Sequence, residues 1–337
     1  QTDVTPTNAR QEHVIHLTNA GKAAYVEGWE DYQAVASYDR DHWFRVPTSY
    51  DGDKLTITLT PEYDSVYFAY FSPYSYDRHQ DLLHNAQMHL DCQLQVLGQT
   101  LDGQDMDLLK IGTDGEGKKV CWMIARQHPG ETMAEWWMEG CIEKLLDNES
   151  ELTRALLKHC DIYLVPNMNP DGSRRGHLRT NAAGCNLNRE WAAPTLKASA
   201  EVFLVKKAMA EIGVDFLLDV HGDESLPYCF IAGTEGLNKW NDERQAQLDF
   251  YRKRLAEINA DFQTTKGYPR KPQGEANMTM STVQIAHLHK CLAMTLEMPF
   301  KDTTATPDQI YGWSTDRCKR LAHSCLVVLN HFLESDL

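Results

Sequence analysis

Two histidines and a glutamate in this 337-residue chain have the residue types and the spacing of metal ligands. His128 and Glu131 lie three positions apart, and His221 follows much later. Two imidazoles and a carboxylate that leave one position open are typical of a catalytic zinc site, whereas a structural site would close that position, usually with cysteine. The sequence therefore predicts one Zn²⁺ per chain, bound in order to activate a water molecule.

A further carboxylate must take the proton of that water molecule, and Glu297 is the candidate. Its neighbours Leu296 and Met298 are apolar, and burial among them would raise the pKa of the carboxyl group toward neutrality. The alternative interpretation is that Glu297 caps a helix that follows Pro299.

The stretch 171–190 is locally basic in an acidic chain, with four arginines against two acidic residues. A guanidinium group is a planar fork that matches a carboxylate with two hydrogen bonds. Beside a zinc-activated water, such groups suit an anionic substrate or an oxyanion. A solvated loop is the plainer interpretation, and it fits Arg174 and Arg175 better than it fits Asn188 and Arg189.

These side chains need elements that bring them together, and apolar runs typical of buried strands provide them. The predicted strands cover residues 119–127, 161–165, 215–220 and 291–296. His128, His221 and Glu297 each follow such a strand directly. Ligands of open α/β sheets collect at the carboxyl ends of the strands, so we expect these side chains to share one crevice.

Alternating strands and helices predict the fold class. Helical periodicity marks residues 131–147, 198–212, 237–259 and 316–333. We therefore expect an α/β fold with a mainly parallel mixed sheet and helices on both faces, as a catalytic domain over residues 105–337. Short alternating runs at 13–17, 55–59 and 66–71 predict a small antiparallel β-sandwich domain over residues 1–104. Gln1 is not a start methionine, which leaves open whether strands precede it.

Composition bounds the partners and the compartment. The net charge of −15 argues against a general affinity for nucleic acid or anionic membranes. No apolar run approaches the roughly 20 residues that span a bilayer. Nine cysteines without a CxxC pair, several of them in strand-like runs, predict buried thiols in a reducing compartment and a cytoplasmic location. The oligomeric state stays open.

The order of these motifs resembles that of the zinc metallocarboxypeptidases, most closely a bacterial type of the cytosolic carboxypeptidase-like branch. The resemblance rests on the HxxE pair, the Asn-Pro-Asp-Gly turn at 169–172, the GxNLNRxW segment at 184–191, His221 and the Thr-Leu-Glu at 295–297. Members of this branch carry a β-sandwich ahead of the catalytic domain, and the aromatic runs near residues 43–46 and 67–76 look like its strands. The similarity thus covers most of the chain.

The resemblance implies a role for each matching residue. His128, Glu131 and His221 become zinc ligands, and Glu297 becomes the general base that later returns its proton to the leaving amine. Arg179 becomes the oxyanion stabiliser, while Asn188 and Arg189 bind the C-terminal carboxylate of the substrate. The implied activity is hydrolysis of the C-terminal peptide bond of peptides or proteins.

Two departures limit what the resemblance implies. Pancreatic-type members have a tyrosine shortly before the catalytic glutamate, whereas residues 275–289 contain none. We assign no tyrosine, because Tyr268 and Tyr311 are distant in sequence. Deglutamylating members have a basic residue in the region that corresponds to 278–282, which here reads Met-Thr-Met-Ser-Thr. The preferred C-terminal side chain is therefore left open.

Two other functions compete with a carboxypeptidase. A zinc deacylase of N-acyl amino acids can share the same ligand set, but the N-terminal sandwich and the Asn188-Arg189 pair favour a peptidase. A non-catalytic binding protein could keep the fold. The presence of all three predicted ligands together with Glu297 argues against that class.

Overall fold

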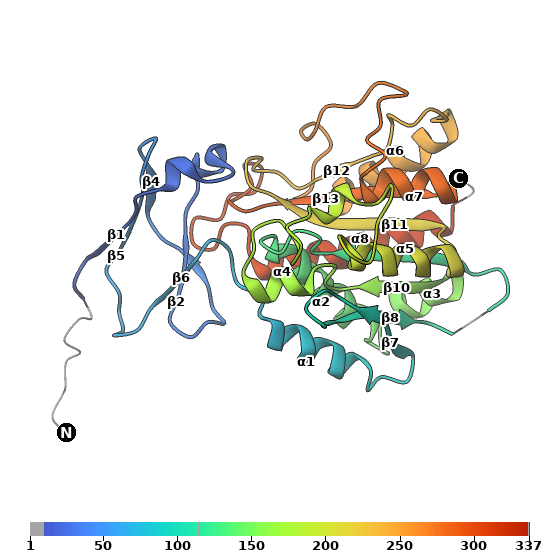
Figure 1. Cartoon of the computed structure of the whole chain (residues 1–337), viewed down its shortest axis with the longest axis horizontal. Helices are drawn as coiled ribbons and strands as arrows, with labels where there is room; N and C mark the ends of the chain where they lie inside the picture. Colours follow the sequence, from blue (N-terminus) through green and yellow to red (C-terminus); the bar gives the residue numbers. More distant parts are fainter. Residues whose placement is uncertain (1–9, 114, 336) are drawn as a thin grey trace.

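The computed structural model describes residues 10–113, 115–335 and 337, with a small N-terminal region beside a larger region built on one sheet (Figure 1). The N-terminal region contains two three-stranded antiparallel sheets, with strand orders β1-β5-β4 and β3-β2-β6. Their bounds are β1 His13–Leu17, β2 Val35–Ser37, β3 Phe44–Arg45, β4 Thr48–Tyr50, β5 Leu55–Leu59 and β6 Tyr67–Ala69. The small antiparallel fold predicted for this region is confirmed.

A compact apolar core joins these two small sheets. Side chains alternate across a strand, so Leu55 and Ile57 of β5 face the same way, and both are buried. They lie in one cluster with Ala36 of β2. Two short 3₁₀ helices, η1 (Ala20–Lys22) and η2 (Val26–Trp29), precede β2 along the chain.

The larger region is built on a seven-stranded mixed sheet with the order β12-β13-β11-β9-β10-β8-β7. The four central strands β13, β11, β9 and β10 are parallel, and the three outer strands pair antiparallel. Their bounds are β7 Cys92–Gln99, β8 Asp105–Ile111, β9 Lys119–Ala125, β10 Cys160–Val165, β11 Phe216–Asp223, β12 Phe230–Ala232 and β13 Leu292–Pro299. The central four are the strands that the sequence predicts.

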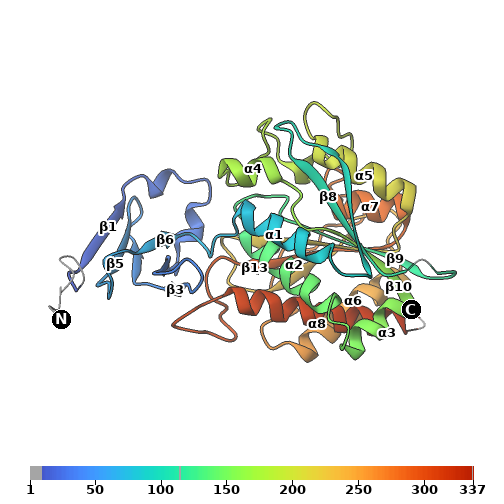
Figure 2. The same ribbon diagram turned by 90° about the horizontal axis from the view of Figure 1, so that it is seen from below.

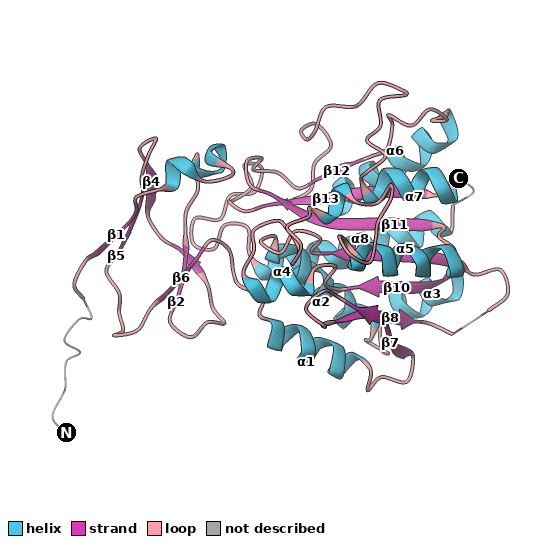
Figure 3. Cartoon of the chain, viewed as in Figure 1, coloured by secondary structure: helices cyan, strands magenta, loops and turns pink. Residues whose placement is uncertain are grey.

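Helices cover both faces of this sheet, as predicted (Figures 2 and 3). Residues of α2, α3, α6 and α8 share one buried cluster with the sheet, and residues of α5 and α7 share the other. The helices are α1 Tyr76–Ala86, α2 Thr132–Leu145, α3 Glu151–His159, α4 Pro170–Arg175, η3 Leu187–Arg189, α5 Ala200–Ile212, α6 Asp242–Ile258, α7 Ser281–His289 and α8 Thr315–Leu333. The four predicted helices correspond to α2, α5, α6 and α8.

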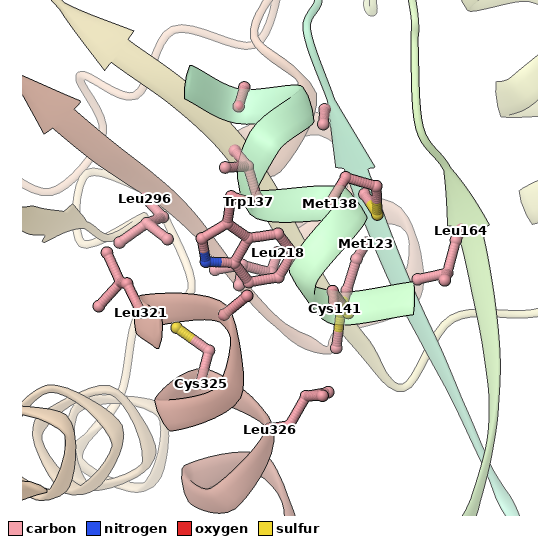
Figure 4. Close-up of a cluster of buried hydrophobic side chains, with 14 of the residues drawn as sticks. Met123, Trp137, Met138, Cys141, Leu164, Leu218, Leu296, Leu321, Cys325 and Leu326 are labelled. Carbon is pink, nitrogen blue, oxygen red and sulfur yellow. The ribbon is translucent and has the colours of Figure 1, made fainter. Parts of the chain in front are cut away.

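The strand β9 shows how one run of sequence supplies both cores. Cys121 and Met123 belong to the cluster under α2 and α8, whereas Trp122 and Ile124 belong to the cluster under α5 and α7. A strand buried on both faces has a continuous apolar run, which is the pattern that predicted it. Figure 4 shows the first cluster, where Trp137 of α2 lies between the sheet and α8.

The division of the chain into domains stays a prediction, but the sheet suggests where a border would lie. β7 precedes the predicted boundary at residue 105, yet it pairs with β8 over most of its length. Helix α1 also contributes Leu83 and Ala86 to the large core. We therefore propose a border between β6 and α1.

One arginine binds the two regions to each other. The Arg45 guanidinium is buried and donates hydrogen bonds to four backbone carbonyls, those of Gln33, Phe300, Tyr311 and Trp313, at 2.6 to 3.3 Å. Lys301 Nζ donates to the carbonyl of Glu30 at 2.5 Å. These contacts hold the N-terminal region against the carboxyl end of β13.

All nine cysteines are free thiols, and eight of them are buried. This agrees with the buried thiols that the sequence predicts. Within the described part of the chain, no helix has the length and apolar character needed to cross a bilayer.

Candidate active site

Three buried side chains converge where β9 and β11 end. His128 and Glu131 lie in the turn between β9 and α2, and His221 lies in β11. His128 Nδ1 is 2.6 Å from Glu131 Oε1, and His221 Nδ1 is 2.8 Å from Glu131 Oε2 and 3.2 Å from His128 Nδ1. The three residues form the group in the described chain whose ligand atoms could hold a metal ion.

The hydrogen bonds around this group fix which atoms are free to bind a metal. Asn186 Oδ1 accepts from the Asn188 amide, so His128 Nε2, 3.0 Å away, must donate to it. His221 Nε2 lies 3.0 Å from the Asp219 carboxylate and donates there. In neutral imidazoles with these hydrogen bonds, the two Nδ1 atoms carry the lone pairs. They face each other and a carboxylate, as ligands around a cation do, so the residues fit Zn²⁺.

The residues that hydrogen-bond to the candidate metal ligands are held in place by further hydrogen bonds. Asp219 Oδ2 accepts hydrogen bonds from Gln127 Nε2 at 2.6 Å and from the Ser281 hydroxyl. The Gly222 amide donates to Glu131 Oε2 at 3.1 Å. Hydrogen bonds of this kind orient metal ligands, and a carboxylate that accepts from an imidazole N–H, as Asp219 does, also raises the basicity of that imidazole.

A buried charge network supports the turn that carries the first two ligands. Arg126 has φ of 58°, and its guanidinium donates to the carbonyls of Pro129 and Tyr74, both at 3.0 Å, and to the Glu135 carboxylate. His79 Nδ1 lies 2.6 Å from the other oxygen of Glu135. A left-handed backbone at a non-glycine residue persists only where the surroundings determine it, and this network does so here.

Glu297 lies beside the ligands because β13 runs parallel to β11, with Glu297 opposite His221. The side chain is buried, and its Oε2 atom has no hydrogen-bond partner in the described chain. Burial, together with the negative charges of Glu131, Asp223 and Asp219, raises the pKa of this carboxyl group above its ordinary value, against the opposing effect of His221. The expected upward shift is thus present. The alternative role in a helix cap does not fit, since the next helix, α8, begins only at Thr315.

Tyr268 is a site residue that the sequence did not reveal. Its hydroxyl donates to Asp223 Oδ2 at 2.6 Å and lies 3.2 Å from Glu297 Oε1. The residue lies in an irregular loop between α6 and α7, so no periodic pattern marks where its side chain points. Tyr311 is half-exposed and does not line this cavity.

The structure separates the arginines of the basic stretch into two groups. Arg175 makes a bidentate ion pair with Asp102, at 2.6 and 2.7 Å, and Arg174 lies over the ring of Tyr76. Neither lines the cavity that contains the candidate metal ligands. The plainer interpretation of exposed arginines therefore fits these two, although they lie at the end of helix α4 and not in a loop.

Arg179 and Arg189, by contrast, both line the cavity. Arg179 Nη1 is 3.7 Å from Glu131 Oε1, and Arg189 Nη1 donates to the Asn188 carbonyl at 2.6 Å. Burial and the charge of Arg179 lower the pKa of Arg189, so the two cations lie close enough to repel each other. Asn188 is buried, and its Oδ1 accepts from the Ser281 amide at 2.9 Å. Two neighbouring cations and an amide can bind an anion.

A single cavity of about 510 Å³ joins these parts. All seven predicted residues line it: His128, Glu131, Arg179, Asn188, Arg189, His221 and Glu297. Its wall also includes Arg252, which pairs with Glu235 at 3.1 Å, and the loop residues Arg270 and Lys271. Tyr25 and Glu27 reach it from the N-terminal region. The geometry supports metal-assisted chemistry on a substrate with an anionic end.

Comparisons with known proteins agree with this geometry. Residues 4–71 match the family model described as cytosolic carboxypeptidase N-terminal domain, and residues 80–224 match the model described as zinc carboxypeptidase. Cytosolic carboxypeptidase 6 of Mus musculus is 30% identical over 60% of this chain, and the match covers 39% of that protein's length.

Two solved structures are similar over nearly the whole chain. The metallo-carboxypeptidase from Burkholderia cenocepacia is 43% identical, with a TM-score of 0.95, over 97% of this chain and 87% of that one. The metallo-carboxypeptidase from Pseudomonas aeruginosa, solved in complex with (2-guanidinoethylmercapto)succinic acid, is 44% identical over the same shares, with a TM-score of 0.94. The chain therefore belongs to the zinc carboxypeptidase family, in the group that carries the N-terminal domain of the cytosolic carboxypeptidases.

Proposed function

We propose that this protein is a zinc-dependent metallocarboxypeptidase that hydrolyses the C-terminal peptide bond of peptides or proteins. The observation that carries the proposal is the sharing of one cavity by a metal-binding triad, a buried carboxylate and two arginines. A zinc ion held by His128, Glu131 and His221 would supply Lewis-acid chemistry, because it lowers the pKa of water and polarises a carbonyl.

The remaining chemistry belongs to the side chains of the chain. The Glu297 carboxylate takes a proton from the attacking water and returns it to the nitrogen of the leaving amine. The Arg179 guanidinium stabilises the negative charge that develops on the carbonyl oxygen. Asn188 and Arg189 bind the terminal carboxylate of the substrate, since an amide and a guanidinium both donate hydrogen bonds to it.

A relative binds a compound with carboxylates, as the substrate proposed here would have. The Pseudomonas aeruginosa protein was solved with a succinic acid derivative, which carries carboxylates. In this chain the cavity wall contains Arg252, Arg270 and Lys271 as well as the Glu235 carboxylate, so its charge alone does not select one C-terminal side chain. We further propose a cytoplasmic location, which suits nine free cysteines.

Substitution of Glu297 by glutamine tests the mechanism. Loss of the general base should lower kcat by about two to four orders of magnitude while the protein still binds one zinc ion. Glu275→Gln, which changes an exposed glutamate outside the cavity, is the matched control. Full activity of the Glu297→Gln variant would contradict the mechanism.

A panel of peptides that differ only in the C-terminal residue, assayed with and without a chelator, tests the reaction. The panel should include acidic, basic and apolar ends, together with N-acyl amino acids. Chelator-sensitive release of the last residue is the expected result. Activity on the N-acyl amino acids with none on the peptides would instead identify a zinc deacylase, and a zinc-free, inactive protein would support a binding function.

A further inference from the structure

The N-terminal region contributes directly to the wall of the active-site cavity. Tyr25 precedes η2 and lines the same cavity as His128, Glu131 and Glu297. This part of the chain matches a different family model from the metal ligands, so its presence in the cavity is not explained by the catalytic motifs. The question is what the tyrosine does there.

Tyr25 faces Arg179, the residue that would stabilise the oxyanion in the proposed function. Arg179 Cζ lies 5.5 Å from the centre of the Tyr25 ring, within the range of a cation–π contact. In the described chain we find no hydrogen bond donated by the Arg179 guanidinium, whose nearest carboxylate oxygen is Glu131 Oε1 at 3.7 Å. Arg189 differs, because a backbone carbonyl holds its guanidinium at 2.6 Å. The Tyr25 ring and the Glu131 carboxylate are therefore the contacts that orient Arg179 in the described chain, and only the ring comes from the N-terminal region.

The backbone that carries Tyr25 is held in place against the larger region. Gly28 packs so closely on Glu224 that a Cβ atom there would lie 3.1 Å from the Glu224 carbonyl oxygen. Its amide donates to the Tyr25 carbonyl at 3.1 Å. Two residues further on, the Glu30 carbonyl accepts a hydrogen bond from Lys301 of the larger region. These contacts fix the position of the Tyr25 ring relative to the cavity.

We propose that Tyr25 is a positioning residue that holds the Arg179 guanidinium toward the reacting carbonyl, so that the N-terminal region forms part of the active site. The inference rests on the proposed function, which supplies the role of Arg179 as the oxyanion stabiliser. Because Arg179 would act on charge that develops in the transition state, loss of its orientation should lower kcat and leave KM nearly unchanged.

The test separates the face of the ring from its bulk. Tyr25→Leu keeps an apolar side chain but removes the π face, and we expect kcat to fall about tenfold, with KM within about twofold of the wild-type value. Tyr25→Phe keeps the ring and should restore kcat to within about twofold. Tyr67→Leu is the matched control: it removes a similar contact, with Arg40 Cζ at 5.6 Å from the ring centre, outside the cavity. Unchanged kcat in Tyr25→Leu would overturn the proposal.

A double substitution shows whether Tyr25 acts through Arg179. Tyr25→Leu should cost little further activity in the Arg179→Met background, since the side chain it orients is already absent. A full tenfold additional loss would overturn the positioning role. The NMR signals of the Arg179 side chain give a readout that needs no catalysis, because the nearby ring shifts them and Tyr25→Leu should abolish that shift. An absent shift overturns the inference, whereas an inactive wild-type enzyme with the shift present overturns only the proposed function.

Discussion

The two ends of the cavity are built in different ways. At the metal end, His128, Glu131 and His221 are buried. Each also makes a hydrogen bond with a residue outside the triad, which is Asn186, Gly222 or Asp219. At the substrate end, Arg189 is exposed and is the last residue of the short helix η3, between α4 and α5. Arg179 precedes it in the same segment, is half-buried and lies 3.7 Å from Glu131. The ends of the parallel strands thus fix the candidate metal ligands and Glu297, while the segment between α4 and α5 presents the groups that would bind the substrate and its oxyanion. Substitutions at the two ends should therefore change different quantities: stability and zinc affinity at the metal end, and KM at the substrate end.

The largest effect should come from the buried charges beneath the metal end. Burial lowers the pKa of His79, but the Glu135 and Asp107 carboxylates raise it more, to about 9 from 6.5. A group whose pKa is higher in the folded state stabilises the fold fully below pH 6.5, and that stability is lost as the pH rises through 9. A proton that the folded state binds and the unfolded state does not changes the free energy of unfolding by at most about 1.4 kcal/mol per pH unit. Between pH 6.5 and pH 9 we therefore expect a loss of stability on the order of 3 kcal/mol.

Urea unfolding at intervals between pH 6 and pH 9.5 measures this loss. His79→Gln should flatten the decline, because it removes the proton that the folded state holds. His84→Gln, which changes an exposed histidine of the same helix α1, should leave the decline as it is. Parallel curves for the wild type and His79→Gln would show that the metal end does not depend on this charge network.

The second effect concerns the outer partner of a ligand. Asp219 accepts a hydrogen bond from His221 Nε2 at 3.0 Å, and Asn in its place keeps the shape but removes the charge. Loss of such a partner typically weakens metal binding by about 10- to 100-fold. We expect that loss in a competition titration against a chromogenic chelator, with KM unchanged in the zinc-saturated enzyme. Equal zinc affinity in Asp219→Asn and wild type would mean that the triad alone sets the affinity.

The same contrast explains how much the sequence could predict. His128, His221 and Glu297 each follow a continuous apolar run, which places them at the carboxyl ends of neighbouring parallel strands. His221 and Glu297 in fact lie within β11 and β13, which extend a few residues beyond the predicted strands. Tyr268 has no such marker, since it lies in a loop and reaches Glu297 through the fold of the intervening chain. Tyr25 comes from a region whose position against β13 depends on buried contacts, such as those of Arg45, that are not local in sequence.

Sequence periodicity also failed to mark parts of the sheet. The outer strand β7 alternates only weakly in burial, because it lies at the sheet edge with many exposed side chains. The predicted border at residue 105 therefore falls between β7 and its partner β8. A central strand such as β9, apolar on both faces, gives a stronger signal.

The third effect should appear at the substrate end alone. Arg189→Lys keeps a positive charge but removes the planar fork that suits a carboxylate. We expect KM for peptides to rise about tenfold, since hydrogen bonds to charged groups contribute about 1.5–3 kcal/mol and lysine retains part of that. Zinc affinity should not change. Arg174→Lys, outside the cavity, is the control. A fall in zinc affinity in Arg189→Lys would contradict the functional separation of the two ends.

Tyr268 gives the smallest effect and the sharpest test, because its hydroxyl lies between the two ends. It donates to Asp223, the last residue of β11, and lies beside Glu297, yet it belongs to the loop between α6 and α7. Tyr268→Phe removes the hydrogen bonds to the Asp223 and Glu297 carboxylates, which contribute about 1.5–3 kcal/mol each. Because they lie within the protein and not on the substrate, only part of this energy affects the reaction, and kcat/KM should fall about fivefold. Tyr311→Phe, outside the cavity, is the control. If kcat falls while zinc affinity is unaltered, the loop that carries Tyr268 contributes to the chemical step, and the two ends share this loop. If KM alone changes, the loop acts only in substrate binding, and the two ends are functionally separate even at Tyr268.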